Sequence, residues 1–441
     1  MKVILILLFS LLISTQLLFG QDSTKAVTPE ELGEVKGAVE GMNETLLEMK
    51  TVLDALKKIK VSGYLQTQYQ TADTAGVSSF AGGNFPGNVR SRFQVRRGRI
   101  KFNYDNDLTQ YVLQIDVTQN GVGIKDAFAS VKEPWLRAAT LTAGVFDRPF
   151  GFEISYSSGS RETPERSRLF QTLFPGEREL GAKIEVMPEI GPLSYFNLKA
   201  GLFNGVLNIA NENDRYKDFI GRLGVQLPFE EQNLAIDGGF SLYSGKAATN
   251  SKFIYSFDNT STIKKYAVDS SISNVNNSYG RVYYGGDIQL YYDLPVLGGF
   301  SLRGEYITGQ QPGTSSSNGF YNPSSTITPL YIRNFQGWYV NYVQNIGLNN
   351  QLLVKYDVLD PNTDVDNNDI GAAGSNFNVA DIKYSTLGLG WIYHWDANVK
   401  FVAYYDIVTN EKINPAATGS LAPFKDELRD NVFTLRMQYK F

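Results

Sequence analysis

The sequence predicts an all-β fold, a transmembrane antiparallel β-barrel of about sixteen strands that follows an N-terminal α-helical coiled coil. Three observations support this prediction. Aromatic residues make up 13% of the 441 residues, and there are 41 Gly and no Cys. No long apolar run follows the first twenty residues, so membrane-spanning helices are not expected. From Val61 onward apolar and polar residues alternate. Strands of this kind can place apolar side chains toward lipid even though the mean hydropathy of the chain is polar.

Residues 1–20 are expected to be a signal peptide. Lys2 supplies the positive charge at the start, residues 3–13 are apolar apart from Ser10, and the small Gly20 suits a cleavage site. The alternative is a single N-terminal membrane anchor. The apolar run is shorter than the ~20 residues that a spanning helix needs, which favours the signal peptide.

Residues 21–60 are expected to form a helix. Thr28 can cap its start, and Glu31 can bond back to the cap. Apolar residues then recur at alternating spacings of three and four, a row that we term the heptad seam: Leu32, Val35, Val39, Met42, Leu46, Met49, Leu53 and Leu56. This spacing predicts a left-handed coiled coil. An amphipathic helix on the barrel or membrane surface is the alternative, because three glycines each weaken the helix by up to ~1 kcal/mol.

Residues 61–441 are expected to form the barrel. Phe93 and Val95 alternate with polar neighbours, and a β-bulge is expected at Arg97-Gly98 before the alternation resumes. A similar alternation runs to the terminal Phe441. Because lipid cannot satisfy an unpaired strand edge, the sheet must close. Long connections are expected outside the cell and short ones on the periplasmic side; examples are Lys246–Asn277 and Gln310–Thr328, and Lys132–Arg137 and Met187–Pro192.

A secreted β-sandwich or β-helix is the soluble alternative. It would expose charged residues around a shared apolar core, whereas the apolar faces here are rich in Tyr, Phe and Trp, as lipid-facing surfaces are. The sequence contains no nucleotide-binding loop, zinc-protease motif or nucleophile elbow. We therefore expect no enzymatic activity, no cofactor, no bound metal and no nucleic-acid partner.

Six basic residues and no acidic residue lie between Arg90 and Asn103. Facing lipid near the membrane midplane would cost ~2–4 kcal/mol for each, so the lumen is their expected position. Guanidinium groups in a lumen can bind oxyanions through paired donors. A predicted constriction loop, Phe150–Glu179, adds further arginines. The predicted pore-lining, anion-contacting residues are Arg92, Arg96, Arg97, Arg99, Lys101, Arg161, Arg166 and Arg168.

The same arginines have a structural alternative. The predicted loop also contains Glu162, Glu165, Glu177 and Glu179, which can pair with wall arginines and hold the loop in place. Both roles are compatible. The formal net charge of -4 gives no support for strong phosphate selectivity, although it does not describe the local field of a pore.

Two further features have candidate roles. The segment Asp360–Asp369 is rich in the oxygen ligands that suit calcium. However, Asp369 and Ser375 stand where an EF-hand loop has Gly and Glu, so an ordinary polar loop is favoured. His394 lies beside Trp and Tyr residues and is expected in an interfacial aromatic belt rather than at a metal.

Four segments between about residues 90 and 185 resemble one family, the phosphate-selective porin O and P family: Ser91–Ile100, Leu141–Glu153, Pro164–Ser167 and Phe174–Gly181. The second contains Pro149-Phe150-Gly151 followed by Glu153, which is similar to an element of that family. The resemblance implies a barrel of about sixteen strands, usually trimeric, whose third loop folds inward. The N-terminal coiled coil is also similar to that of DcaP-type channels, which carry small anions such as dicarboxylates.

The resemblance implies an outer-membrane porin for passive diffusion of small hydrophilic solutes, biased to anions such as phosphate or small carboxylates. The expected location is the outer membrane of a Gram-negative-type bacterium, with helix 21–60 in the periplasm. Expected partners are outer-membrane lipid and further copies in a homotrimer. The alternative is a structural tether or adhesin, anchored by the barrel and binding a partner through the coiled coil. A membrane-embedded hydrolase is disfavoured by the missing motifs.

Overall fold

The structure is a computed structural model that describes residues 28–206, 212–322 and 327–441. The predicted signal peptide, residues 1–20, lies outside the described residues. The chain divides into two compact units, Met1–Lys58 and Ile59–Phe441, and each is described by itself.

The first unit contains the helix α2 (Pro29–Lys57). The predicted cap is confirmed: the Glu31 amide donates to Thr28 Oγ1 at 3.3 Å, and the Thr28 amide donates to Glu31 Oε2 at 3.0 Å. These bonds satisfy backbone donors that the first helical turn leaves free. Every side chain of the heptad seam is exposed on the single chain. Pairing of the seam with another helix stays a prediction.

No helix in the described part of the chain is both long enough and apolar enough to span a membrane.

The second unit is a sheet of eighteen strands. They are β1 (Ile59–Ala72), β2 (Ser91–Asn106), β3 (Thr109–Thr118), β4 (Gly121–Lys132), β5 (Ala139–Asp147), β6 (Arg178–Val186), β7 (Phe196–Phe203), β8 (Asp218–Phe229), β9 (Leu234–Ala248), β10 (Ile254–Asp258), β11 (Lys265–Asp269), β12 (Ser278–Leu294), β13 (Gly298–Gly313), β14 (Leu330–Ile346), β15 (Asn350–Asp360), β16 (Tyr384–His394), β17 (Val399–Asn410) and β18 (Val432–Lys440).

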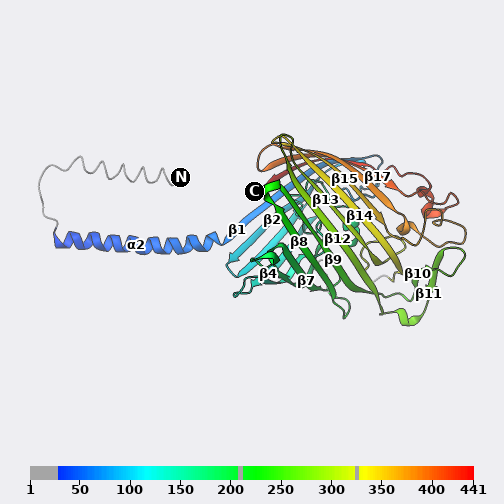
Figure 1. Cartoon of the computed structure of the whole chain (residues 1–441), viewed down its shortest axis with the longest axis horizontal. Helices are drawn as coiled ribbons and strands as arrows, with labels where there is room; N and C mark the ends of the chain where they lie inside the picture. Colours follow the sequence, from blue (N-terminus) through cyan, green and yellow to red (C-terminus); the bar gives the residue numbers. More distant parts are fainter. Residues whose placement is uncertain (1–27, 207–211, 323–326) are drawn as a thin grey trace. The chain divides into compact units, whose positions relative to one another are not determined.

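Short helices lie in the connections: α3 (Arg168–Leu173), η1 (Pro192–Tyr195), η2 (Glu230–Gln232), η3 (Ile272–Asn274), η4 (Val379–Asp381) and η5 (Gly419–Lys425). Figure 1 shows the tilted strands side by side, with β10 and β11 at the end of the barrel where the long connections gather.

The sheet closes into an antiparallel barrel. Each wall strand pairs with the next in the chain, β9 pairs with β12, and β18 pairs with β1 from Tyr64↔Lys440 to Ala72↔Val432. Of the eighteen strands, β10 and β11 form a separate hairpin, so sixteen described strands make up the wall. This confirms the predicted antiparallel barrel of about sixteen strands. Closure is required because lipid offers no hydrogen bonds to a free strand edge.

Alternation along each strand separates a lipid face from a lumen face. On β1, Leu65 is 43% exposed whereas Gln66 is 1% exposed, and on β2 the Phe93 side chain is 83% exposed. Buried polar side chains therefore point inward and exposed apolar ones outward, the reverse of a soluble protein.

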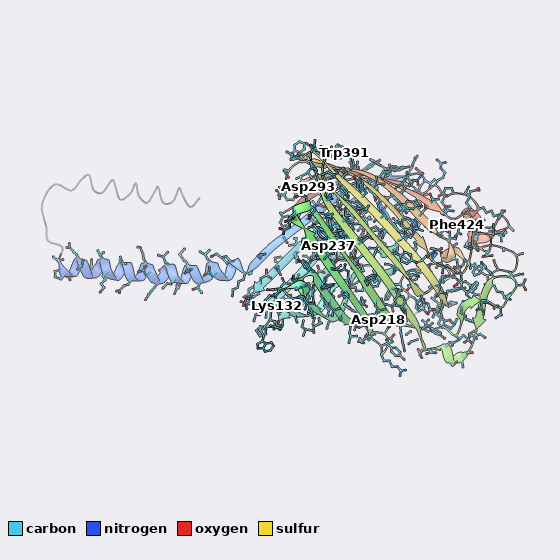
Figure 2. All side chains as sticks on the ribbon, viewed as in Figure 1. Lys132, Asp218, Asp237, Asp293, Trp391 and Phe424 are labelled. Carbon is cyan, nitrogen blue, oxygen red and sulfur yellow. The ribbon has the colours of Figure 1, made fainter. Side chains whose placement is uncertain are left out.

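The two ends of the barrel differ in the length of their connections. Strands at one end are joined by residues 107–108, 133–138, 187–195, 230–233, 295–297, 347–349 and 395–398. The other end has mostly long connections, including 73–90, 148–177, 249–277, 361–383 and 411–431. In Figure 2, Phe424 lies at this second end, while Trp391 and Asp293 lie toward the first.

The boundaries of the predicted long connections were too wide. β9 continues to Ala248 and β13 to Gly313, beyond the expected strand ends at Lys246 and Gln310. The connection from β9 to β12 is also not a plain loop, because it carries the β10–β11 hairpin, whose β10 adds in parallel to the start of β14. Polar side chains at strand ends obscure where pairing stops, so periodicity alone misplaces such boundaries.

Candidate functional site

The connection between β5 and β6, residues 148–177, folds into the barrel, and we term it the inner loop. One side of it is aromatic. Phe150 packs edge-on against Tyr283 of β12 at 6.4 Å between ring centroids, and Phe170 packs against Tyr339 of β14 at 6.2 Å. These contacts reach wall strands far from β5 and β6 in the chain. The structure therefore has the inward-folded third loop that the family resemblance implies.

Gly151 explains the Pro-Phe-Gly element at the start of the inner loop. Its backbone has φ of 61°, and a Cβ there would lie 2.2 Å from Glu305 Oε2. The space is taken because the Glu305 carboxylate accepts hydrogen bonds from the amides of Phe152 at 2.8 Å and Glu153 at 2.6 Å. Only glycine permits both the left-handed backbone and this close approach.

Glu165 ties the middle of the inner loop to the wall. Its carboxylate pairs with Arg96 at 2.8 Å, Arg97 at 2.6 Å and Arg436 of β18 at 2.9 Å. Burial would raise the pKa of Glu165, but the guanidinium groups of these arginines outweigh it and hold that pKa well below its usual range. The carboxylate is therefore ionised and forms a fixed anchor.

Other ties attach the inner loop to further strands. Glu153 pairs with Lys355 of β15 at 2.7 Å, and Glu162 pairs with Arg303 of β13 at 2.8 Å. Ser158 Oγ lies 2.6 Å from the hydroxyl of Tyr64 on β1. Ties on several sides of the barrel hold the loop as a partition across the lumen.

The bulge on β2 lies one residue from the predicted place. Gln66 pairs with Arg97 but Thr67 pairs with Val95, so Arg96 is the extra residue, not Arg97-Gly98. A bulge lets neighbouring side chains point the same way. Arg96 and Arg97 thereby both reach Glu165, a contact that the sequence spacing does not reveal.

The eight predicted pore-lining residues fall into three groups. Four pair with carboxylates: Arg96 and Arg97 with Glu165, Arg99 with Asp116 at 3.2 Å, and Arg166 with Glu177. Two bind neutral oxygen atoms: Arg92 those of Gln70 and the backbone of residues 82–84, and Arg161 the carbonyls of Thr163 and Pro164. Two make no ion pair or side-chain hydrogen bond with a described residue: Lys101 and Arg168.

Arg168 starts the short helix α3 and is held by two aromatic rings. Its guanidinium lies 4.6 Å from the ring centre of Phe80 and 3.9 Å from that of Tyr384. Stacking of this kind orients the guanidinium plane without neutralising its charge. Among the described residues its buried Nε has no hydrogen-bond partner. Arg168 thus keeps a donor available to a solute, unlike Arg96, Arg97 and Arg166, which pair with carboxylates.

Arg168 lines a cavity of about 650 Å³ that we term the vestibule. The vestibule is enclosed by the connections at the long-connection end, with Phe80, Tyr384 and Phe424 among its lining residues. A second cavity of about 30 Å³, which we term the chamber, adjoins it and shares four lining residues: Ser78, Phe80, Arg168 and Asp430. Burial raises the pKa of Asp430 to about 6, although Arg168 opposes that rise.

Several residues of the site were not predicted. Asp357 and Asp406 line the chamber, and both are lumen-facing positions in strands whose alternation was recognised. Their position on the polar face of each strand indicates that they point into the lumen. The sequence does not indicate that β15 and β17 lie next to α3. Arg436 and Glu305 were missed for the same reason.

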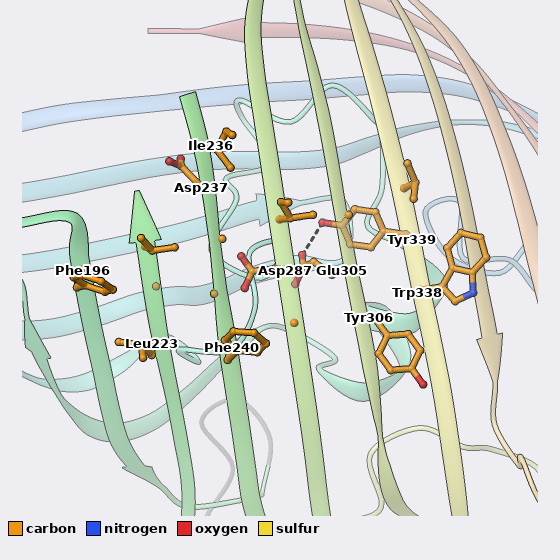
Figure 3. Close-up of a pocket in the computed structure, with 18 residues that line it drawn as sticks. Phe196, Leu223, Ile236, Asp237, Phe240, Asp287, Glu305, Tyr306, Trp338 and Tyr339 are labelled. Carbon is orange, nitrogen blue, oxygen red and sulfur yellow. Dashed lines mark hydrogen bonds between the residues drawn. The ribbon is translucent and has the colours of Figure 1, made fainter. Parts of the chain in front are cut away.

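A larger cavity, about 720 Å³, lies against the wall and does not belong to the solute pathway. It is a furrow among exposed apolar side chains of β8, β9, β12, β13 and β14, with Gly238, Gly286 and Gly304 in its floor. Figure 3 shows Phe240, Tyr306 and Trp338 on these strands, and the hydrogen bond between Tyr339 and Glu305. Its lining is almost wholly apolar, as expected for a surface that faces lipid.

The described residues contain no group of three or more His, Asp or Glu suited to a metal ion. In the segment 360–369, Asp366 and Asp369 both pair with Lys264, at 3.1 and 2.9 Å. His394 is partly buried, and its Nε2 lies 3.1 Å from Gln351 Oε1.

Comparison with known proteins identifies a family. The family model described as phosphate-selective porin O and P matches residues 74–441. No curated protein matches the chain. Solved structures with a similar fold include OprB of Pseudomonas putida (9% identity, TM-score 0.57, covering 89% of this chain and 96% of that one). Others are an anion-selective porin of Comamonas acidovorans (10%, 0.52, 87% and 99%) and the outer-membrane channel DcaP of Acinetobacter baumannii (12%, 0.50, 87% and 97%).

Proposed function

Because the chain belongs to the phosphate-selective porin O and P family and is thus an outer-membrane channel, we propose that it conducts small hydrophilic solutes by passive diffusion with a bias to anions. The observation that carries the bias is Arg168, a lumenal guanidinium with no ion pair to a described residue. Its planar donors fit carboxylate and phosphate oxygen atoms. The name of the Comamonas acidovorans relative, an anion-selective porin, agrees with this bias.

The arginines on β2 contribute to the proposal in a different way. Most of them are neutralised by Glu165 and Asp116, so they hold the inner loop and the wall rather than attract solutes. A charge with a carboxylate partner at hydrogen-bond distance has a weak field a few ångströms away. The proposed bias therefore depends on the groups without a carboxylate partner, first Arg168 and Lys101, and then Arg92 and Arg161, whose partners are neutral oxygen atoms.

Replacing Arg168 with Gln tests the bias. The change removes one unpaired positive charge where water is confined and screening is incomplete, so anions should lose their advantage. We expect the reversal potential of purified protein in a KCl gradient to shift toward cations. The matched control is Arg137→Gln, which removes an exposed arginine paired with Asp107 in a short turn and should leave the reversal potential unchanged. Equal potentials in wild type and R168Q would refute the proposed bias.

We further propose that residues 1–20 are a signal peptide, that the barrel is a homotrimer and that α2 lies in the periplasm. The exposed heptad seam supports self-association, because water disfavours such an apolar row on a lone helix. The tether or adhesin stays the second candidate. It is supported by the number of ties that hold the inner loop across the lumen, and a barrel that carries no current in a planar bilayer would favour it.

A further inference from the structure

The chamber that adjoins the vestibule is small and highly charged. Its volume of about 30 Å³ accommodates one or two groups the size of a water molecule. Seven charged side chains line it: Glu165, Arg166, Arg168, Lys355, Asp357, Asp406 and Asp430. They come from the inner loop, from β15 and β17, and from the connection before β18.

Three of these seven side chains are already neutralised. Glu165 pairs with three arginines, Arg166 with Glu177, and Lys355 with Glu153. What remains is one guanidinium, that of Arg168, and three carboxylates: Asp357, Asp406 and Asp430. No ion pair joins Arg168 to any of these three.

Each of the remaining carboxylates has at least one oxygen atom without a donor. Asp357 is 5% exposed, and its Oδ1 has no hydrogen-bond partner among the described residues. Asp430 Oδ1 is likewise buried without a partner, and the Asp406 carboxylate makes no hydrogen bond or ion pair with the described chain. A buried carboxylate oxygen without a donor is costly. The chamber therefore presents several carboxylate oxygen atoms that can accept hydrogen bonds from a bound solute.

We propose that the chamber and the adjoining face of Arg168 bind a small zwitterion, with the ammonium group of the solute in the chamber and its carboxylate on Arg168. The three aspartates supply the acceptors that an ammonium group needs, and it is about the size of a water molecule. Arg168 supplies a planar pair of donors for the carboxylate. This inference rests on the proposed function and narrows its solute class to compounds such as α-amino acids.

The shape of the two cavities fits such a solute. An α-amino acid has its ammonium and carboxylate groups on one carbon atom, so both poles can be engaged where chamber and vestibule meet at Arg168. Its side chain then extends into the roughly 650 Å³ of the vestibule, beside the rings of Phe80, Tyr384 and Phe424. A lone anion would also bind Arg168 but would leave the unpartnered carboxylate oxygen atoms without a donor. A lone cation would leave Arg168 without an acceptor.

Equilibrium binding to detergent-solubilised full-length protein tests the inference without requiring conduction. The probes are radiolabelled glycine, acetate and methylammonium at neutral pH. We expect glycine to bind at least about tenfold more tightly than either single-charge probe, since it engages both poles. Asp357→Asn and Asp406→Asn, separately and together, should weaken glycine and methylammonium but not acetate. Arg168→Gln should weaken glycine and acetate but not methylammonium.

The matched control is Asp237→Asn. Asp237 is a partly buried aspartate on β9, and it does not line the chamber. The control variant should bind all three probes like the wild type, and heat-modifiable mobility in gels checks that each variant is folded. Equal glycine binding by wild type and folded D357N/D406N protein would overturn the inference, as would glycine binding no tighter than acetate binding. Current through planar bilayers is measured on the same preparations. A silent wild type would overturn the channel, while the binding results would still decide the zwitterion site.

Discussion

At the residue scale, charges in the lumen differ in what they can do according to whether they have a partner. Glu165 pairs with Arg96, Arg97 and Arg436, and these ion pairs attach the inner loop to the barrel wall. Arg168 meets two aromatic rings and no carboxylate, so its charge can act on a solute. Both kinds of arginine look alike in a sequence, and only their surroundings separate a scaffold from a binding group.

Replacing Glu165 with Gln should loosen the inner loop. Removing one partner of a buried ionic group leaves the other charges uncompensated, at a cost of about 3–5 kcal/mol. We expect noisier open-channel current and faster cleavage of the inner loop by added protease. The control is Glu189→Gln, which removes one partner of an exposed pair with Lys132 and should change neither. Quiet current in E165Q would show that the aromatic contacts alone hold the loop.

The low pKa of Glu165 determines the pH range in which its ion pairs hold the inner loop. A carboxylate whose pKa is depressed in the folded state contributes its full stabilisation above the unfolded value of about 4.3, and loses it as pH falls through the folded value. Current noise of the wild type should therefore stay constant from pH 7 to pH 5 and rise only under stronger acid. A rise near pH 6 would point to another group.

At the element scale, the strands build the wall and the connections determine what passes it. The long connections gather at one end, where β10 and β11 form an additional hairpin and the vestibule opens. At the other end, each connection joins its two strands within a few residues. This asymmetry is typical of outer-membrane barrels, whose long loops face outward.

Peptide tags test this orientation. A tag inserted in residues 259–264, the turn of the β10–β11 hairpin, should bind antibody on intact cells. A tag in residues 133–138, a short turn at the opposite end, should bind only after the outer membrane is breached. Both sites lie outside the strands, so folding should tolerate them. The reverse pattern would invert the barrel in the membrane.

At the scale of the whole molecule, the two units have different tasks. The barrel is closed by its own strand pairing and needs no helix to complete it. The helix α2 has an exposed apolar row, which self-association of the chain would cover. We therefore expect the helix to determine assembly and the barrel to determine permeation.

Deleting residues 21–58 tests this division. The deletion ends at Lys58 because β1 begins at Ile59. The barrel should remain folded and heat-modifiable, while the oligomer should dissociate at lower temperature or detergent concentration, as read by native gels. The matched variant Leu46→Glu keeps the helix but places a charge in the heptad seam, and it should weaken the oligomer in the same way. Loss of barrel folding on deletion would make the helix part of the barrel.

Much of the fold can be predicted from local sequence patterns, without knowledge of the tertiary packing. Alternation through Phe93 and Val95 predicts lipid and lumen faces, and the capping box at Thr28 predicts where α2 begins. These signals are strong because each depends on neighbours within a few residues. Boundaries such as that of β9, and the bulge at Arg96, were misplaced because pairing with a distant strand decides them.

Local patterns alone establish that this chain is a closed barrel with a helix before it and which strand forms its arginine-rich part, because periodicity and the exclusion of free strand edges from lipid are sufficient for those conclusions. The resemblance of its motifs to the porin family implied which loop folds inward, and the contacts of the inner loop with β12 and β14 confirm it. Only the tertiary structure decided that Glu165 neutralises Arg96 and Arg97 while Arg168 stays without a carboxylate partner, facing Asp357 and its neighbours. The reason is that a charge acts over a few ångströms of space, and closing the barrel brings together residues that are hundreds of positions apart.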